Sequence, residues 1–229
     1  MDDPAQLIRT IAVLALPLLF AITVLALPLL FAITVHEAAH GYVARMLGDT
    51  TASMLGRVTL NPIKHIDPVG TLIVPTLLFV TTGFVLGWAK PVPVNTRNLR
   101  YPKRDMAIVA IAGPAANLAM AVCWGLVLKW GLTLQGSLDW VAAPLILMGQ
   151  VGIAVNLILM VLNLLPIPPL DGGRVMAGVL PLAAAQWLAT VERYGLWILI
   201  GLLVTGVLGQ IITPMVAISE TAILRLLGL

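Results

Sequence analysis

Five long stretches that contain no charged residue dominate this 229-residue sequence. Each is at least as long as the roughly 20 residues that a helix needs to cross a bilayer. Hydrophobic residues make up 60% of the chain and charged residues only 10%, so a soluble domain would lack polar surface. Because lipid cannot satisfy unpaired backbone groups, we predict an all-α, polytopic membrane helix bundle. The uncharged stretches are residues 10–35, 68–89, 106–128, 140–170 and 194–219.

We predict a single domain over residues 1–229. The first stretch follows Asp2 and Asp3 rather than basic residues, and it has no small-residue cleavage site. We therefore expect it to stay in the membrane instead of being removed as a signal peptide. Membrane helices are expected at about residues 8–47, 106–130, 140–165 and 194–217.

The second stretch, residues 68–89, is the weakest candidate for a span. Pro75, Gly83 and Gly87 interrupt it, and a proline removes a helix hydrogen bond. We predict a re-entrant or hairpin element here, which leaves about four full spans.

The motif HEAAH, residues 36–40, follows the first uncharged stretch. His36 and His40 are four residues apart, so a helix places them on the same face, where both can bind one metal ion. Glu37, about 100° round the helix, lies beside that metal without being a ligand, which is the arrangement for metal-assisted hydrolysis. The alternative is a pair of surface histidines, but ionisable groups at a membrane span are costly and are usually functional.

Two histidines need a third ligand from elsewhere in the chain. Asp171 directly follows the fourth stretch, in NLLPIPPLDGG at residues 163–173. The three prolines there unwind the helix, and the two glycines let the backbone pass close to a neighbour. Such broken backbone is tolerated at membrane depth only where it faces protein or a wet cavity. We predict Asp171 as the third ligand.

These ligands constrain the topology. HEAAH and Asp171 both lie toward the C-terminal ends of their stretches, so the first and fourth helices must run parallel. Five full spans would make them antiparallel, which again indicates that residues 68–89 enter and return. One face then holds ten of the thirteen basic residues, and the positive-inside rule directs it, with the site, toward the cytoplasm. These are Arg45, Arg57, Lys64, Lys90, Arg97, Arg100, Lys103, Arg104, Arg174 and Arg193.

The remaining sequence features indicate the lipid bilayer as a partner. The net charge of +3 gives no sign of a nucleic-acid partner, because the basic residues flank apolar stretches. Cys123 is the single cysteine, so an internal disulfide is excluded. We expect Cys123 to act only as a small apolar side chain in helix packing. LALPLLFAITV occurs at residues 14–24 and again at 25–35, and eleven residues return a helix to within about 20° of its starting direction.

Three motifs together resemble the site-2 protease family of intramembrane zinc metalloproteases: HEAAH, AGPAANLAM at residues 112–120, and NLLPIPPLDGG. LGRVTLNPIKHIDPVGTL and GWAKPVPVN resemble its compact branch without PDZ or CBS domains. The resemblance runs from about residue 29 to the last span. It implies a multi-pass protein of the cell membrane that carries one Zn²⁺ per chain. Such a protein would hydrolyse a peptide bond within or near the transmembrane segment of a single-span membrane protein.

The resemblance also implies roles for individual residues. It makes His36, His40 and Asp171 the zinc ligands and Glu37 the general base. Asn117, in AGPAANLAM, would lie near the substrate carbonyl and stabilise the oxyanion. Hydrogen bonding between helices is the alternative for Asn117.

Four further features have either two possible roles or a purely structural one. Asn156 and Asn163 are predicted to hydrogen bond between packed helices. His65, in NPIKHIDP, either shapes entry to the site or belongs to a turn capped by its neighbours. KPVPVN, residues 90–95, cannot be helical, and it either holds an unwound substrate by edge pairing or forms a short loop.

Two other functions use the same residues. A metal-ion transporter could bind its ion at His36, His40 and Asp171, but it has no need for Glu37. A non-catalytic membrane scaffold could keep zinc for stability.

Overall fold

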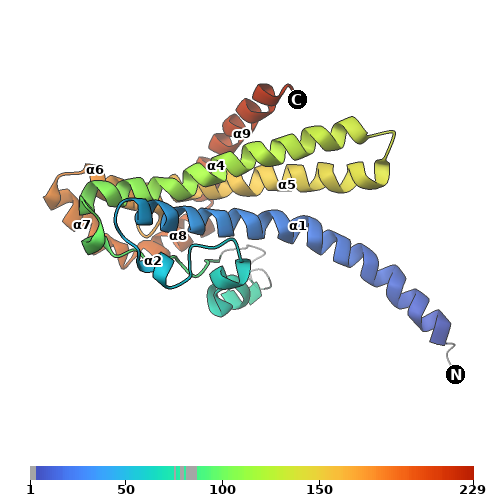
Figure 1. The fold of residues 1–229 in the computed structure, drawn as a ribbon, viewed down its shortest axis with the longest axis horizontal. Coiled ribbons are helices and arrows are strands. Elements are labelled where there is room, and N and C mark those ends of the chain that lie inside the picture. The colour runs from blue at the N-terminus through green and yellow to red at the C-terminus, as the bar shows by residue number, and fades with distance from the viewer. Residues whose placement is uncertain (1–3, 75, 78–79, 81–86) are drawn as a thin grey trace.

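The computed structural model describes residues 4–74, 76–77, 80 and 87–229. This part of the chain is helical and contains no strand (Figure 1). The long helices are α1 (Pro4–Met46), α4 (Pro102–Leu134), α5 (Asp139–Leu164) and α9 (Val207–Leu227). The shorter elements are α2 (Thr51–Met54), η1 (Pro62–His65), η2 (Pro68–Ile73), η3 (Thr96–Asn98), α6 (Asp171–Val179), α7 (Leu182–Glu192) and α8 (Gly195–Val204).

Four helices of the described chain are long and apolar enough to cross a membrane. They are the Ile22–Met46 part of α1 together with α4, α5 and α9. The apolar helices α7 and α8 form one further pair, which is bent by 69°. The predicted all-α, polytopic bundle with about four spans is therefore confirmed.

The last span differs from the prediction. A single helix was expected over residues 194–217, but the chain forms α8 and α9 with a break at Gly206, whose φ is 76°. Glycine adopts this left-handed conformation without the steric cost of a Cβ atom. The fourth candidate span is consequently Val207–Leu227. The helices expected at 8–47, 106–130 and 140–165 lie within four residues of α1, α4 and α5 at each end.

The connection between α1 and α4 leaves and returns at the same end of the bundle. The backbone N–H of Arg100 donates to the carbonyl of Leu47 at 3.2 Å, so the end of α1 and the start of α4 lie together. It follows that α4 runs antiparallel to α1 and that α5 runs parallel to α1, as Figure 1 shows. The sequence predicted this parallel arrangement of the two helices.

The predicted re-entrant or hairpin element lies within this connection. Of residues 68–89, positions 75, 78–79 and 81–86 lie outside the described part of the chain. The described ends meet, because the N–H of Trp88 donates to the carbonyl of Gly70 at 3.0 Å and the hydroxyl of Thr71 donates to the carbonyl of Trp88 at 2.9 Å. The two described ends of this stretch therefore lie side by side, and the re-entrant or hairpin element itself stays a prediction.

The apolar core lies where α4, α5 and α9 pack together. Trp124 and Leu128 of α4 contact Ile153 and Leu157 of α5, and α9 contributes Ile223. All five side chains are at least nine-tenths buried. This core fixes α5 against α4 and so determines where the end of α5 lies.

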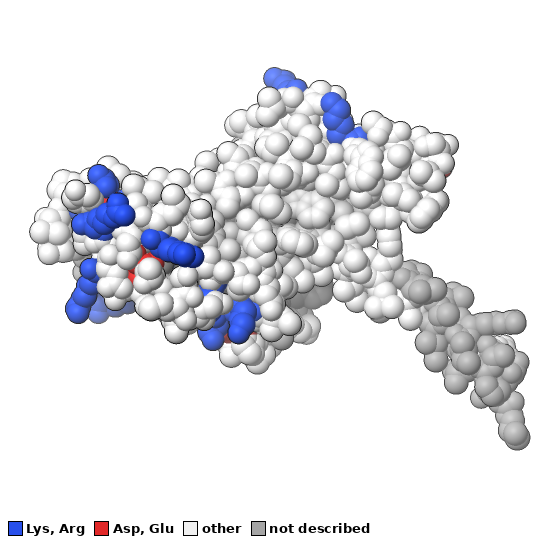
Figure 2. Space-filling model, viewed as in Figure 1, with Lys and Arg blue, Asp and Glu red and all other residues white. Residues whose placement is uncertain are grey.

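Charged side chains are absent from the middle of the bundle in the view of Figure 2. Lys and Arg gather at the end where α1 stops and α4 begins, and a smaller group lies near the C-terminal end of α9. A belt without charge between two charged ends fits a bilayer.

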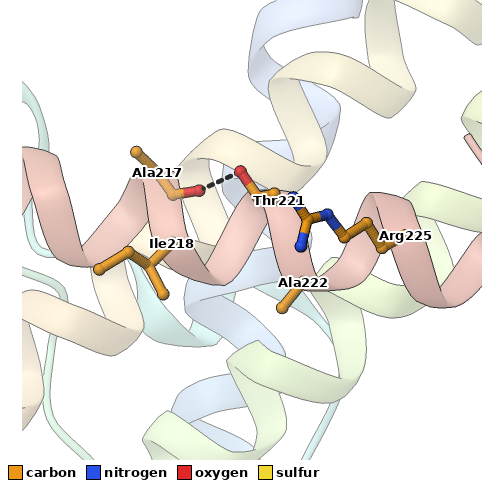
Figure 3. Close-up of a pocket in the computed structure, with 5 residues that line it drawn as sticks. All are labelled: Ala217, Ile218, Thr221, Ala222 and Arg225. Carbon is orange, nitrogen blue, oxygen red and sulfur yellow. Dashed lines mark hydrogen bonds between the residues drawn. The ribbon is translucent and has the colours of Figure 1, made fainter.

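An outer face of α9 forms the shallow depression in Figure 3, lined by Ala217, Ile218, Thr221, Ala222 and Arg225. All five residues belong to this one helix, and the hydroxyl of Thr221 donates to the carbonyl of Ala217 at 2.8 Å. The depression contains none of the predicted metal ligands.

The duplicated segment lies in α1, whose 43 residues correspond to about 65 Å. This is about twice the thickness of a bilayer core. The N-terminal part of α1 extends beyond α4 and α5 in Figure 1. One copy of the repeat is therefore sufficient for a span.

Deletion of residues 14–24 should leave the fold and the metal site unchanged. The deletion places Val13 in front of Leu25, and the native residue at that place, Val24, is also a valine. The sequence from Leu25 onward is unchanged, and residues 10–13 (TIAV) take the places of 21–24 (AITV), so we expect the melting temperature and the bound metal per chain to match those of the full chain. Both can be measured on purified protein by a thermal melt and by elemental analysis. Loss of bound metal in the shortened protein would show that the first copy supports the site.

Candidate metal centre

Three buried side chains from two parts of the chain converge at the end of HEAAH. The Nε2 atoms of His36 and His40 are 3.0 Å apart, and each lies 3.2 Å from Oδ2 of Asp171. No other group of three or more His, Cys, Asp or Glu residues in the described chain brings its ligand atoms so close. The structure thus brings together the three predicted ligands.

The three distances fit a tetrahedral zinc site. Zinc bonds of about 2.0–2.1 Å to nitrogen and oxygen place neighbouring ligand atoms about 3.3 Å apart. The observed separations of 3.0–3.2 Å approach this value. His36 lies ten residues before Met46, the last residue of its span, or about 15 Å along the helix. The histidines therefore lie within this candidate span.

Asp171 reaches the histidines because the chain turns back after α5. The helix ends at Leu164, and α6 begins at Asp171 itself. A Cβ atom on Gly172 would lie 2.3 Å from the carbonyl oxygens of Leu164 and Leu165, so this fold-back requires glycine. The close approach predicted for the two glycines after Asp171 is present in the structure.

Hydrogen bonds fix which nitrogen of each histidine faces the centre. Nδ1 of His40 lies 2.7 Å from the carbonyl of Val109, and a carbonyl can only accept, so Nδ1 carries the proton. Nδ1 of His36 lies 2.6 Å from Oδ1 of Asn117, which is likewise an acceptor. In their neutral forms, which are the forms that bind a metal, both rings therefore direct an Nε2 lone pair inward.

In these tautomers neither Nε2 atom carries a proton, so neither can donate a hydrogen bond to Asp171. Oδ2 of Asp171 is buried and has no hydrogen-bond donor. A carboxylate and two imidazole lone pairs at such distances repel one another unless a cation lies between them. The donor set fits zinc.

Gly113 of α4 allows the two helices to meet at this point. A Cβ atom there would lie 2.4 Å from Nε2 of His40 and 2.5 Å from Cε1 of His36. Any side chain at this position would occupy the space of the imidazole rings. Gly113 lies within AGPAANLAM, but the sequence alone did not predict this role for it.

Glu37 lies beside the cluster and is held by the chain. Its Oε2 accepts the backbone N–H of Val92 at 2.8 Å, and its side chain is half-buried. The cluster of converging ligand atoms does not include Glu37. One carboxylate oxygen is thus fixed by the backbone, and the position of Glu37 fits a base that is not a ligand.

The segment that holds Glu37 is extended. Three alternate residues, Trp88, Lys90 and Val92, donate their N–H groups on one side of the chain. Their acceptors are carbonyls of residues 65–70 and the Glu37 carboxylate. A period of two residues is that of an extended strand, and no helix forms here, as predicted.

Arg57 and two prolines define the rest of this segment. The buried guanidinium of Arg57 donates from Nη2 to the carbonyl of Lys90 at 2.7 Å and to that of Pro91 at 3.3 Å. Pro91 and Pro93 have no N–H group. On the opposite edge of the segment these two residues can therefore only accept hydrogen bonds, through their carbonyls. Edge pairing with a substrate stays a prediction.

Asp49 anchors the end of the same connection, a role that the sequence alone did not predict. Its carboxylate accepts the N–H of Asn95 at 2.7 Å, the N–H of Thr51 at 3.0 Å and the amide of Asn98 at 3.0 Å. Burial raises the pKa of Asp49, but the hydrogen bonds from Thr51, Asn98 and Asn95 together outweigh this and hold the pKa below its usual value. The charged form of Asp49 therefore ties the connection to the end of α1.

The contacts of His65 favour the simpler of its two predicted roles. It is buried, and its Nε2 lies 3.0 Å from the carbonyl of Thr59. Asn61 and Asp67 accept backbone N–H groups that begin η1 and η2. His65 is not part of the metal cluster, so these contacts fit the capped turn.

Asn117 is the predicted site residue whose contacts differ from its expected role. Its amide nitrogen donates to the carbonyl of Ala32 at 3.2 Å and to Oδ1 of Asn156 at 3.0 Å. Both N–H groups are thus used inside the protein, and the carbonyl oxygen faces His36. The oxyanion role stays a prediction, while the contacts support orientation of His36. The predicted hydrogen bond between helices is present for Asn156. The hydrogen bond of Asn163 instead goes to the carbonyl of Leu159 within its own helix, so the prediction was wrong for Asn163.

Comparison with known proteins supports the same interpretation. The family model described as peptidase family M50 matches residues 139–206, which include Asp171. The chain is 37% identical over 196 residues to "Putative zinc metalloprotease YwhC" of Bacillus subtilis, covering 84% of this chain and 85% of that protein.

A second relative is more distant. The chain is 32% identical over 178 residues to "Putative zinc metalloprotease Rip2" of Mycolicibacterium smegmatis, covering 77% of this chain and 64% of that protein. No solved structure matches the chain significantly. The similarity to YwhC extends along most of both chains and confirms the resemblance seen in the sequence. The chain therefore belongs to peptidase family M50, the site-2 protease family.

Proposed function

We propose that this intramembrane zinc metalloprotease hydrolyses a peptide bond within or near the transmembrane segment of a single-span membrane protein. Membership of the peptidase family supports the reaction and the metal. The observation that carries the proposal is the convergence of three buried ligand atoms at 3.0–3.2 Å, well inside a candidate span.

In the proposed mechanism His36, His40 and Asp171 hold the zinc ion. When bound, zinc supplies a Lewis acid that lowers the pKa of water toward about 7 and polarises a carbonyl. Glu37 takes the proton of the attacking water and passes it to the leaving amine. The N–H of Val92 holds one carboxylate oxygen and leaves the other for this transfer. Buried walls on α1, α4 and α5 limit the access of bulk water.

A metal-ion transporter uses no general base beside its ion. The position of Glu37 next to the cluster and the membership of a peptidase family both favour hydrolysis. The transporter and scaffold alternatives receive no support from the comparisons.

The substrate class can be tested in the host cell. A peptide bond in a transmembrane helix reaches the site only after local unwinding, and a single helix can unwind without disturbing a packed bundle. We expect single-span membrane proteins to accumulate uncleaved when the native chain is replaced by Glu37→Gln, as measured by comparative membrane proteomics. Accumulation of soluble proteins alone would contradict the proposed substrate class.

We also propose that the protein lies in the cell membrane with its active site toward the cytoplasm. The basic end of the bundle in Figure 2 supports this orientation by the positive-inside rule. Met54, in α2 beside the end of α1, is 76% exposed. In a Cys123→Ala background, Met54→Cys should react with a membrane-impermeant maleimide in inverted vesicles and not in intact cells. The reverse pattern would overturn the orientation.

Arg57→Gln should slow cleavage without removing zinc. Arg57 holds the carbonyls of Lys90 and Pro91, and the next residue, Val92, holds Glu37. We expect about a tenfold lower kcat, since misplaced catalytic groups cost rate steeply, while zinc per chain stays at the wild-type value. Arg97→Gln is the matched control because the Arg97 side chain is exposed. Equal rates for both variants would show that Arg57 does not position the base.

A further inference from the structure

Asn156 is a fully buried amide of α5 that the mechanism above does not use. Its Nδ2 donates to the carbonyl of Gly152 at 2.8 Å, and its Oδ1 accepts from Nδ2 of Asn117 at 3.0 Å. Asn117 in turn accepts Nδ1–H of His36. We propose that Asn156 is a positioning residue of the zinc site, which fixes the orientation and tautomer of His36 through Asn117.

Backbone carbonyls fix the donor and the acceptor of each hydrogen bond in the series that links Asn156, Asn117 and His36. The carbonyl of Gly152 can only accept, so the amide nitrogen of Asn156 must face it and the amide oxygen must face Asn117. The carbonyl of Ala32 also only accepts, at 3.2 Å from Nδ2 of Asn117. Two acceptors therefore hold the amide nitrogen of Asn117 away from His36. Oδ1 of Asn117 therefore faces His36, and it can only accept a hydrogen bond from Nδ1–H of that ring.

This arrangement determines the atom that meets the metal. With the proton on Nδ1, the Nε2 atom of His36 presents its lone pair toward His40 and Asp171. Without Asn156, only the carbonyl of Ala32 would oppose a flip of the Asn117 amide. A flipped amide would place an N–H group against Nδ1 and favour the tautomer with the proton on Nε2, which cannot bind zinc. Partners that orient a metal-binding histidine typically contribute about 10–100-fold in metal affinity.

Asn163 provides a matched control on the same helix. It makes the same bond to the backbone four residues earlier, from Nδ2 to the carbonyl of Leu159 at 3.0 Å. Among the described hydrogen bonds its side chain reaches no other helix. A loss that arises only from removing an amide from α5 would therefore affect Asn163 and Asn156 alike.

The test is a double-mutant cycle on zinc affinity, measured with the purified protein and a competing chromophoric zinc chelator. We expect Asn156→Leu to weaken zinc binding by about tenfold or more and Asn163→Leu to change it by less than about twofold. In an Asn117→Leu background, Asn156→Leu should add less than about twofold, because the residue acts through Asn117. Thermal melts of the zinc-free proteins report folding, and Asn156→Ala replaces the leucine variant if that variant does not fold.

The outcomes separate this inference from the proposed function on which it rests. Wild-type protein that binds no zinc would overturn both. Wild-type protein that binds zinc, with an Asn156→Leu variant of equal affinity, would overturn only the role of Asn156. The same loss in both backgrounds would also overturn it, because the effect would then bypass Asn117.

Discussion

Replacement of Glu37 by glutamine should abolish cleavage while the protein keeps its zinc. A glutamine has the same shape, and its amide oxygen can still accept the N–H of Val92, which lies 2.8 Å from Glu37 in the native chain. It cannot take a proton from water, so we expect kcat to fall by about 10²–10⁴-fold. Zinc per chain should be unchanged, because Glu37 lies outside the cluster of converging ligand atoms. Cleavage of a membrane-anchored substrate in vesicles and elemental analysis measure the two quantities.

Glu192→Gln is the control for this experiment. Glu192 is the last residue of α7, and its side chain is exposed, so the same chemical change there should leave both rate and zinc content unaltered. A Glu37→Gln protein that cleaves at the wild-type rate would show that another group acts as the base.

Replacement of Gly113 by alanine should remove the zinc site although it adds only one methyl group. That group would lie 2.4 Å from Nε2 of His40 and 2.5 Å from Cε1 of His36, so both rings must move. Displacement of reacting groups by about 1 Å can cost about 10²-fold in rate, and here the metal ligands themselves move. We expect at least this loss of cleavage together with loss of most of the bound zinc.

The stability of the Gly113→Ala protein gives a second measurement. Alanine favours a helix over glycine by about 1 kcal/mol, so loss of zinc cannot be attributed to a weaker helix. Gly209→Ala is the matched control in α9, because nothing lies within 4 Å of a Cβ atom there. Retention of zinc by Gly113→Ala would show that the helices can separate at this point without losing the site.

The sequence predicted the parts of the site that depend on charge and periodicity. His36, His40 and Asp171 are ionisable groups at or beside apolar stretches, where such groups are costly, and this cost identified them. Their need to meet also required α5 to run parallel to α1. The structure has that arrangement (Figure 1), so a chemical requirement determined a feature of the topology.

The features missed in the sequence depend on contacts between distant residues. Gly113 acts through the absence of a side chain, which a pattern of residue types does not distinguish from ordinary helix packing. The orientation of the Asn117 amide depends on Ala32 and Asn156, which lie on two other helices. The bond between Glu37 and Val92 joins residues 55 positions apart. None of these contacts leaves a local signal.

The break between α8 and α9 was missed for a different reason. The stretch 194–219 contains no charged residue and includes Gly195, Gly201, Gly206 and Gly209. Only Gly206 among these adopts a left-handed φ. Apolar residues stand on both sides of the break, so hydropathy alone does not indicate which glycine ends a helix.

Zinc-dependent cleavage in a bilayer tests the central claim most directly. The purified protein would be placed in vesicles with a single-span substrate, and the products would be identified by intact mass before and after zinc removal by a chelator. We expect cleavage within or next to the apolar segment of the substrate, loss of cleavage on zinc removal, and recovery when about one equivalent of zinc per chain is restored. Cleavage that persists after zinc removal, or no cleavage by the zinc-loaded protein, would contradict an intramembrane zinc metalloprotease.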